Sequence, residues 1–179
     1  MNIVLIGPRC SGKTTVGRLL AERTGRVFRD SDALVEAMVG TTIESLIATR
    51  GWEIFRVLEK RAVATLAAKD RQVIATGGGA VEDRDNARNL AERGFVVWLD
   101  GRPEILIGRL EAQQRSGLVR PSLTGEDPLE EMRWIVTTRR SHYESIAALR
   151  IDTTDRTAAE VADKIIVTLE QEGEQPHGR

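Results

Sequence analysis

The first segment that could do chemistry is Gly-Pro-Arg-Cys-Ser-Gly-Lys-Thr at residues 7 to 14, which matches the pattern G-x-x-x-x-G-K-[ST]. Its glycines permit a tight turn whose backbone N–H groups converge on phosphate oxygens at the beginning of a helix, where the helix dipole favours negative charge. Lys13 can reach the β- and γ-phosphates, and the Thr14 hydroxyl can bind Mg²⁺. The apolar run Ile3–Ile6 precedes the segment and a helical pattern follows it, as the motif requires. These residues predict binding of a nucleoside triphosphate; the alternative is a strand-to-helix turn that uses glycine for geometry alone.

Within this segment, Arg9 and Cys10 stand at positions that the pattern leaves open. No histidine lies nearby in the sequence to activate the Cys10 thiol as a nucleophile, so we do not expect it to react. We expect the segment as a whole to serve the nucleotide. The residues expected to contact it are Gly7, Arg9, Cys10, Ser11, Gly12, Lys13, Thr14 and Thr15.

Two carboxylates follow the second apolar run, in the sequence Asp30-Ser31-Asp32. If the backbone is extended there, Asp30 and Asp32 point to the same side, at the edge of a parallel sheet where ligands bind. One carboxylate could then hold Mg²⁺ through water while the other holds an acceptor hydroxyl. The alternative is that Ser31 or Asp32 caps the following helix, and the residues alone leave both interpretations open.

Two further patterns point to an anionic acceptor. Phe-Arg-Val-Leu-Glu at residues 55–59 places Arg56 and Glu59 on one helix face, where the acid could orient the guanidinium for bidentate binding of a carboxylate. By itself this could be a surface pair. Three consecutive glycines, Gly77 to Gly79, follow a buried run and cost backbone entropy, which indicates a backbone that approaches a ligand closely.

Other charged residues have simpler default interpretations. Asp100 ends an apolar run and could contact a metal ion, but Gly101 follows it, so a role in a turn or helix start is an equal alternative. Arg139 and Arg140 lie near the end of a helical pattern, where the default is a solvated charge or a partner of the helix dipole.

Composition excludes several classes of protein. The 179 residues carry a net charge of −1 and one cysteine, which disfavours nucleic-acid or membrane partners and fits a reducing compartment, so we expect a cytoplasmic protein. The first apolar run is too short to span a bilayer. No asparagine is followed by lysine, so the guanine-reading element of GTPases is absent.

The elements that must position these residues follow from short apolar runs at residues 3–6, 26–29, 73–75, 96–99 and 149–151, each followed by a helical pattern. This alternation predicts an α/β fold, a three-layer sandwich with about five parallel strands. The length suits one domain.

Three segments are additional to this repeat. One helix begins at about residues 41–44 and ends near Gly51, and a second helix begins at Trp52 and continues towards Lys69. Residues 112–125 form a polar, turn-rich stretch that carries Arg115 and Arg120 and is suited to a lid over phosphate. Residues 172–179 predict a disordered tail.

With these features the chain resembles the shikimate kinase family from Met1 to about Leu169. The tryptophan at position 52 makes it more similar to the second of the two enterobacterial-type isoenzymes than to the first. The resemblance implies a P-loop kinase domain over residues 1–171 with strand order 2-3-1-4-5, a substrate-binding helical region at about 31–61 and a lid at about 112–125. The motifs that carry it are the phosphate loop, Asp-x-Asp at 30–32, Phe-Arg-x-x-Glu at 55–59, the triple glycine, Arg-Pro-x-Leu at 120–123 and an arginine four residues before Tyr143.

For the donor, the resemblance implies ATP with Mg²⁺. Lys13 and Arg120 would stabilise the phosphoryl group during transfer, and Asp30 would hold Mg²⁺ with Thr14. The residues expected near adenine are Arg109 and Arg156.

For the acceptor, the resemblance implies phosphorylation of the 3-hydroxyl of shikimate to shikimate 3-phosphate, in the biosynthesis of aromatic amino acids. Asp32 would bind that hydroxyl and act as base, Arg56 and Arg139 would bind the carboxylate, and Glu59 would orient Arg56. The residues expected to contact the ring hydroxyls through their backbone are Gly77, Gly78 and Gly79.

Two alternatives remain. Another small-metabolite kinase of the same architecture, such as a gluconate or nucleoside monophosphate kinase, would share the phosphate loop but would not be expected to combine Phe-Arg-x-x-Glu with the triple glycine. A nucleotide-binding regulatory module could keep the fold without catalysis. We expect the protein to be a monomer.

Overall fold

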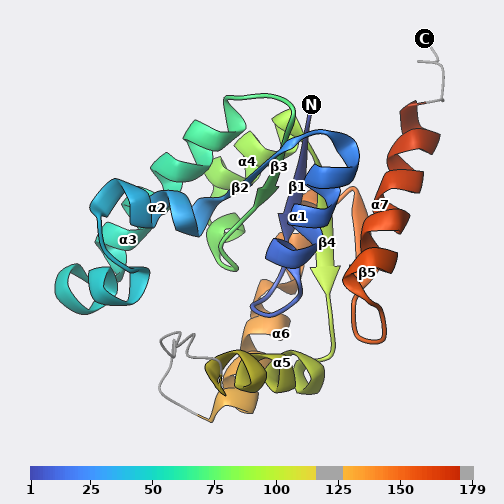
Figure 1. Cartoon of the computed structure of the whole chain (residues 1–179). Helices are drawn as coiled ribbons and strands as arrows, with labels where there is room; N and C mark the ends of the chain where they lie inside the picture. The colour runs from blue at the N-terminus through green and yellow to red at the C-terminus, as the bar shows by residue number, and fades with distance from the viewer. Residues whose placement is uncertain (116–126, 174–179) are drawn as a thin grey trace.

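Strands and helices alternate along residues 1–115 and 127–173, the part of the chain that the computed structural model describes (Figure 1). All five runs predicted as strands form strands. None of the helices in this part of the chain has the length and apolarity needed to cross a membrane. The elements are β1 (Asn2–Ile6), α1 (Lys13–Thr24), β2 (Val27–Asp30), α2 (Ser31–Val39), α3 (Ile43–Ala67), β3 (Gln72–Ala75), the 3₁₀ turn η1 (Ala80–Glu82), α4 (Arg84–Arg93), β4 (Gly94–Asp100), α5 (Pro103–Arg115), α6 (Pro128–Ile146), β5 (Leu149–Asp152) and α7 (Ala158–Gly173).

The strands form a five-stranded parallel sheet in the order β2-β3-β1-β4-β5, which confirms the predicted order. The central strand β1 pairs with β3 and β4, and Ile3 lies opposite Val73 on one side and Phe95 on the other. Every residue of β1 is buried because helices cover both faces of the sheet. Parallel strands end at the same edge, so the segments after β1, β2 and β3 meet there.

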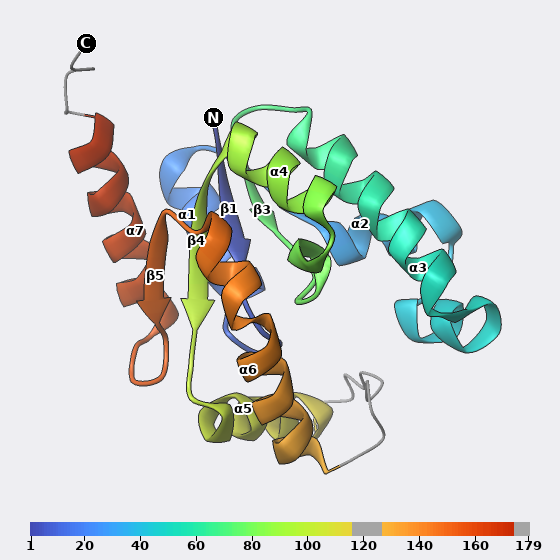
Figure 2. The same ribbon diagram turned by 180° about the vertical axis from the view of Figure 1, so that it is seen from behind.

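Two layers of helices enclose the sheet. Helices α1 and α7 cover one face, where Leu20 of α1 packs in the same apolar cluster as Leu5 (Figure 1). Helices α3, α4 and α6 cover the other face (Figure 2), where Leu90 and Tyr143 pack in a second cluster with Trp98. The predicted three-layer sandwich is therefore confirmed.

Helices α2 and α3 extend this architecture at the β2 edge, where they share a small core of their own. The chain leaves helical geometry at Gly51, where φ is +81° and ψ is 169°, a conformation suited to glycine. Residues Ile43–Ala67 are thus two helical rods joined at Gly51, as the sequence predicts. The core residues of this pair are Val35, Leu46, Phe55 and Ala62.

Two boundaries differ from the sequence prediction. Helix α5 continues to Arg115, so residues 112–115, which the sequence predicts as part of the polar loop, are helical. Most of these residues are polar, a composition that is also common in loops, but alanine, glutamine and arginine are good helix formers. Helix α7 likewise continues to Gly173. The rest of the predicted loop and tail lies outside the described residues.

Helix α1 sits unusually close to the sheet at Gly17. A Cβ on Gly17 would lie 2.5 Å from Cε2 of Phe28 and 3.3 Å from Cδ1 of Leu5. Because α1 begins at the end of the phosphate-loop segment, this contact helps to fix the position of the loop.

We predict opposite effects for one substitution at two helical glycines. Gly17→Ala should lower the free energy of unfolding by about 1–3 kcal/mol, because the new methyl group overlaps Phe28. Gly108→Ala in α5 should raise it by about 0.5–1 kcal/mol, because a Cβ there meets nothing within 4 Å and alanine favours the helix. Urea unfolding of both variants measures the difference. Equal effects would contradict the proposed close packing of α1.

Candidate active site

The phosphate-loop segment turns tightly between β1 and α1, and the backbone geometry of this turn explains why Gly7 and Gly12 are glycines. Gly7 has a φ of +138°, and a Cβ there would lie 2.2 Å from the carbonyl oxygen of Leu99. Gly12 has a φ of +97° and precedes the first residue of α1. The Lys13 ammonium group donates to the carbonyl oxygens of Gly7 (2.9 Å) and Pro8 (2.7 Å). The loop therefore presents its lysine and the N-terminus of α1 on one side.

Cys10 differs from its neighbours because it is a non-glycine residue with a positive φ of 59°. Its carbonyl oxygen accepts a hydrogen bond from Arg109 of α5 (3.4 Å), and its Sγ lies 3.6 Å from Oε1 of Gln113. Gln113 is a residue that sequence reasoning did not select. These contacts connect the loop to helix α5.

A pocket lies between this loop and the carboxyl ends of β2 and β3, as expected for an open α/β sheet. It brings the nucleotide-loop residues and both predicted carboxylates together. It also includes Thr76 and Gln113, which the sequence did not single out. The lining residues are Arg9, Cys10, Gly12, Lys13, Thr14, Thr15, Asp30, Asp32, Thr76, Gly78 and Gln113.

The two carboxylates are arranged differently from the extended backbone that the sequence suggested. Asp30 is the N-cap of α2: its Oδ1 accepts from the N–H groups of Asp32 (2.9 Å) and Ala33 (3.4 Å). Neither Ser31 nor Asp32 is the cap, because the helix already begins at Ser31. The other oxygen of Asp30 accepts from the Thr14 hydroxyl (3.3 Å). Asp30 therefore combines the capping role with a position beside the loop.

Thr14 and Asp30 offer oxygen ligands, the kind that Mg²⁺ prefers. Magnesium usually keeps several waters and takes only one or two protein ligands together with phosphate oxygens, so a hydroxyl and a carboxylate 3.3 Å apart beside the phosphate loop fit that ion.

Arg56 and Glu59 form a pair that the protein partly encloses. The Nη1 of Arg56 lies 2.6 Å from Oε2 of Glu59, whose side chain is only 3% exposed. Burial raises the pKa of the Glu59 carboxyl above its ordinary value, and the nearby Arg56 charge opposes this rise. The guanidinium also lies over the rings of Trp52 and Phe55. The alternative of a simple surface pair is wrong, because Glu59 is buried.

The triple glycine passes between charged side chains. A Cβ on Gly77 would lie 2.7 Å from Oδ1 of Asp32 and 2.8 Å from Oε1 of Glu59. A Cβ on Gly79 would lie 2.8 Å from Nη2 of Arg56. Gly77 and Gly79 are therefore needed because protein side chains crowd them.

The segment is held in place from two sides. Gly77 donates its N–H to the buried hydroxyl of Ser31 (2.9 Å). The Gly78 carbonyl oxygen accepts from the hydroxyl of Tyr143 (2.6 Å). Tyr143 is buried, its ring stacks on Trp98, and burial raises the pKa of its phenol.

Arg139 is a buried residue of α6, with a side chain 7% exposed. Its Nε forms an ion pair with Oε1 of Glu82, the last residue of η1. Its Nη1 would lie 3.6 Å from a Cβ on Gly78. The default interpretation of a solvated charge at the helix end is therefore wrong for Arg139, although Arg140 is exposed. Glu82 was not found from the sequence, which offers no local signal for it.

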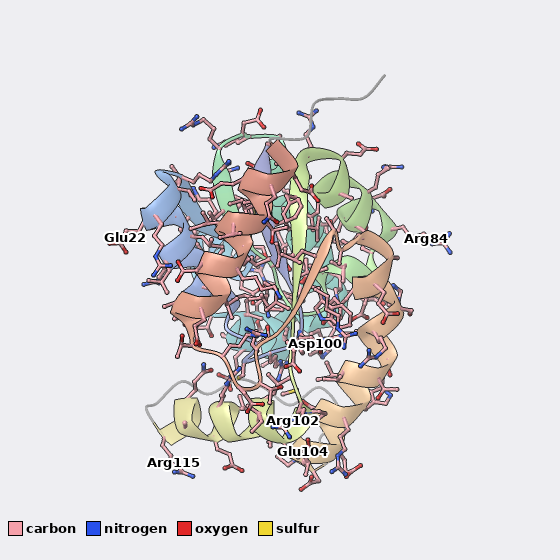
Figure 3. All side chains as sticks on the ribbon, turned by 90° about the vertical axis from the view of Figure 1, so that its right-hand side faces the viewer. Glu22, Arg84, Asp100, Arg102, Glu104 and Arg115 are labelled. Atoms are coloured by element: carbon pink, nitrogen blue, oxygen red, sulfur yellow. The ribbon has the colours of Figure 1, made fainter. Side chains whose placement is uncertain are left out.

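The other arginines singled out from the sequence have different positions. Arg109 bridges the loop and the segment after β5: its Nη1 donates to Oγ1 of Thr153 (3.1 Å) and its Nη2 to the Thr153 carbonyl oxygen (2.7 Å). Arg156 is exposed in the turn after β5. Arg115 pairs with Glu111 on α5 and points away from the molecule (Figure 3). Arg120 lies outside the described residues.

Asp100 lies at the carboxyl end of β4 (Figure 3), and its carboxylate accepts hydrogen bonds from neighbouring protein groups. One carboxylate oxygen accepts from the Gly101 N–H (2.9 Å), and the other accepts from Nε (3.0 Å) and Nη2 (2.5 Å) of Arg150. Of its two predicted roles, the turn role is the one that these contacts support.

Comparisons with known proteins identify the family of this chain. A family model described as shikimate kinase matches residues 9–170. A shikimate kinase from Symbiobacterium thermophilum is 49% identical over 98% of this chain and 99% of its own length. The solved shikimate kinase from Acinetobacter baumannii, in complex with shikimate, has a TM-score of 0.88 and 35% identity and covers 98% of this chain and 95% of its own.

A gluconokinase from Sinorhizobium meliloti covers 97% of this chain and 93% of its own with a TM-score of 0.63, but at 20% identity it shares the fold alone. The family match spans residues 9–170, a range that contains Lys13, Thr14, Asp30, Asp32, the triple glycine and Arg139. The chain belongs to the shikimate kinase family.

Proposed function

We propose that the protein transfers the γ-phosphoryl group of ATP to the 3-hydroxyl of shikimate and releases ADP and shikimate 3-phosphate. The observation that carries this function is the convergence of Asp32, Arg56 and Arg139 on the triple glycine, next to a phosphate loop. A carboxylate beside a phosphate loop suits a hydroxyl nucleophile, and two guanidinium groups suit a carboxylate a few ångströms away. Membership of the shikimate kinase family supports the same assignment.

On the donor side, the loop N–H groups and the N-terminus of α1 would bind the β- and γ-phosphates. Lys13 would exchange its two carbonyl partners for phosphate oxygens. Thr14 and Asp30 would hold Mg²⁺, which supplies neutralisation of phosphate charge when bound. Arg109, already hydrogen-bonded to the loop and to Thr153, would border the adenine site. Arg156 is proposed beside adenine and Arg120 beside the transferring phosphoryl group.

On the acceptor side, Asp32 would hold the 3-hydroxyl in line with the bond to be broken. The hydroxyl oxygen forms the new bond to the γ-phosphorus, the bond from that phosphorus to the bridging oxygen of ADP breaks, and the hydroxyl proton leaves towards Asp32. In a loose transition state this proton leaves late, so orientation of the nucleophile is the main contribution of Asp32. Arg56 and Arg139 would bind the carboxylate, and Gly77 to Gly79 would meet the ring.

The proposal includes a single domain over residues 1–171, with residues 31–61 forming the acceptor side, acting as a monomer in the cytoplasm. A net charge of −1 supports the absence of nucleic-acid and membrane partners.

The acceptor is tested with a panel. Release of ADP should be fast with shikimate and near background with gluconate or a nucleoside monophosphate. Shikimate holds its carboxylate and 3-hydroxyl on a rigid ring, whereas gluconate is a flexible open chain and a nucleoside monophosphate carries a phosphate in place of the carboxylate. Coupled detection of ADP measures all three. Turnover of gluconate without turnover of shikimate would contradict the proposed substrate.

Asp32→Asn should lower kcat by about 10²- to 10⁴-fold, because the amide orients the hydroxyl poorly and cannot accept its proton. Binding of ADP, measured by titration calorimetry, should change little because the loop N–H groups, Lys13 and Thr14, which would hold the phosphates, are unchanged. Asp163→Asn provides a matched control, since Asp163 forms a surface pair with Arg23 far from the loop. Near-normal turnover by Asp32→Asn would remove Asp32 from the reaction.

Gly78→Ala should impair binding of shikimate without unfolding the protein. A Cβ there lies no closer than 3.5 Å to any atom, its nearest neighbours being Gly7 O, Arg139 Nη1 and Arg9 N, so the free protein can accommodate it. The methyl group would stand between the phosphate loop and Arg139, where the acceptor must lie. We expect the KM for shikimate to rise by at least about tenfold, equivalent to about 1.4 kcal/mol, with an unchanged melting temperature. An unchanged KM would place the acceptor elsewhere.

A further inference from the structure

Glu82 lies directly after the triple glycine, at the end of the short turn η1 (Ala80–Glu82). Its Oε1 forms the ion pair with Nε of Arg139. The same oxygen would lie 2.9 Å from a Cβ on Gly79, and Nη2 of Arg56 would lie 2.8 Å from that point. One carboxylate oxygen of the protein is therefore paired with Arg139 and lies close to Arg56, the two arginines that bind the substrate carboxylate in the proposed function.

The charges at this position are already balanced before any substrate arrives. Arg56 is paired with Glu59, and Arg139 is paired with Glu82. Asp32 adds a further carboxylate close by, since its Oδ1 and Oε1 of Glu59 lie within 3 Å of a single Cβ position on Gly77. A second carboxylate on the buried Arg139 would therefore meet the negative charge of Glu82 and of Asp32 and would be repelled by it.

The two glutamates differ in their freedom to leave. The Glu59 side chain is 3% exposed and is enclosed beneath Arg56, so it must stay. The Glu82 side chain is 40% exposed and belongs to a three-residue turn. Rotation about its side-chain bonds can carry the carboxylate into water without moving buried residues. A buried guanidinium needs an anionic partner at all times, and Glu82 supplies one when no ligand is bound.

We propose that Glu82 is an internal competitor for the substrate carboxylate: it occupies Arg139 in the free protein and is displaced when the acid binds. Binding is then an exchange of one carboxylate for another, and Glu82 sets the affinity for the acid acceptor. This inference rests on the proposed function for its substrate. The anion site itself does not depend on that substrate.

The first test is Glu82→Gln, which keeps the shape and removes the charge. The KM for shikimate should fall by about fivefold or more, because the acid no longer competes with a bound carboxylate, an effect of the size expected for one charged pair. The KM for ATP should stay within about twofold, because Glu82 is not among the residues that line the loop pocket. Glu104→Gln is the matched control, since Glu104 also pairs with an arginine, Arg133, but on the surface. A rise in the KM for shikimate would overturn the proposal and would show that Glu82 positions Arg139 instead.

A second test needs no turnover. Acetate, a minimal carboxylate, should raise the melting temperature of Glu82→Gln at millimolar concentration and leave the unmodified protein and Glu104→Gln unaffected. Equal stabilisation of all three proteins would overturn the proposal. If Glu82→Gln folds poorly, Glu82→Asp keeps the charge with a shorter reach and should give an intermediate KM; a KM above that of the unmodified protein would count against competition.

The two tests separate the inference from the proposed function. If the unmodified protein fails to phosphorylate shikimate but acetate stabilises only Glu82→Gln, the proposed substrate is wrong and the displaceable carboxylate stands. If shikimate is phosphorylated and its KM does not fall in Glu82→Gln, the function stands and the competitor is wrong.

Discussion

Exclusion of water from charged side chains dictates the arrangement at the carboxyl edge of the sheet. The side chains of Glu59, Glu131 and Arg139 are 3%, 8% and 7% exposed, and a buried charge is costly unless an opposite charge meets it. Glu59 meets Arg56, Arg139 meets Glu82, and Glu131 lies 3.8 Å from Arg9. The Arg56–Glu59 pair lies within one helix, whereas the Arg9–Glu131 and Glu82–Arg139 pairs join segments that are far apart in the sequence. The need to pair buried charges therefore also helps to hold these segments together.

Helix α6 is where these requirements combine. Glu131 near its start meets Arg9 of the phosphate loop, and Arg139, about two turns later, meets Glu82 beside the triple glycine. Tyr143, one turn further, donates to the Gly78 carbonyl oxygen. One rigid helix therefore contacts the loop expected to bind the donor and the segment expected to bind the acceptor. The small apolar cluster of Leu106, Met132 and Val136 also fastens α6 to α5.

The triple glycine shows how a local pattern can be interpreted correctly in part. Its presence after a buried strand indicated a backbone that approaches a ligand closely. At Gly77 and Gly79 the close neighbours are carboxylate and guanidinium groups of the protein itself. Only Gly78 has room for a methyl group. Glycine is therefore required at Gly77 and Gly79 by protein side chains, but not at Gly78. A linear sequence does not distinguish them, because the neighbours come from α2, α3, η1 and α6.

The sequence by itself determined the strands, their parallel order through the family resemblance, the loop and most residues that meet at the site. Apolar periodicity and glycine spacing are local properties, and burial of apolar runs largely dictates an α/β fold. It did not determine that Asp30 caps α2, that Arg139 is buried, or that Glu82 pairs with Arg139 close to Arg56. Those facts depend on distances between residues far apart in the chain, and a charge becomes buried or paired only when packing brings its partner within a few ångströms and removes the water.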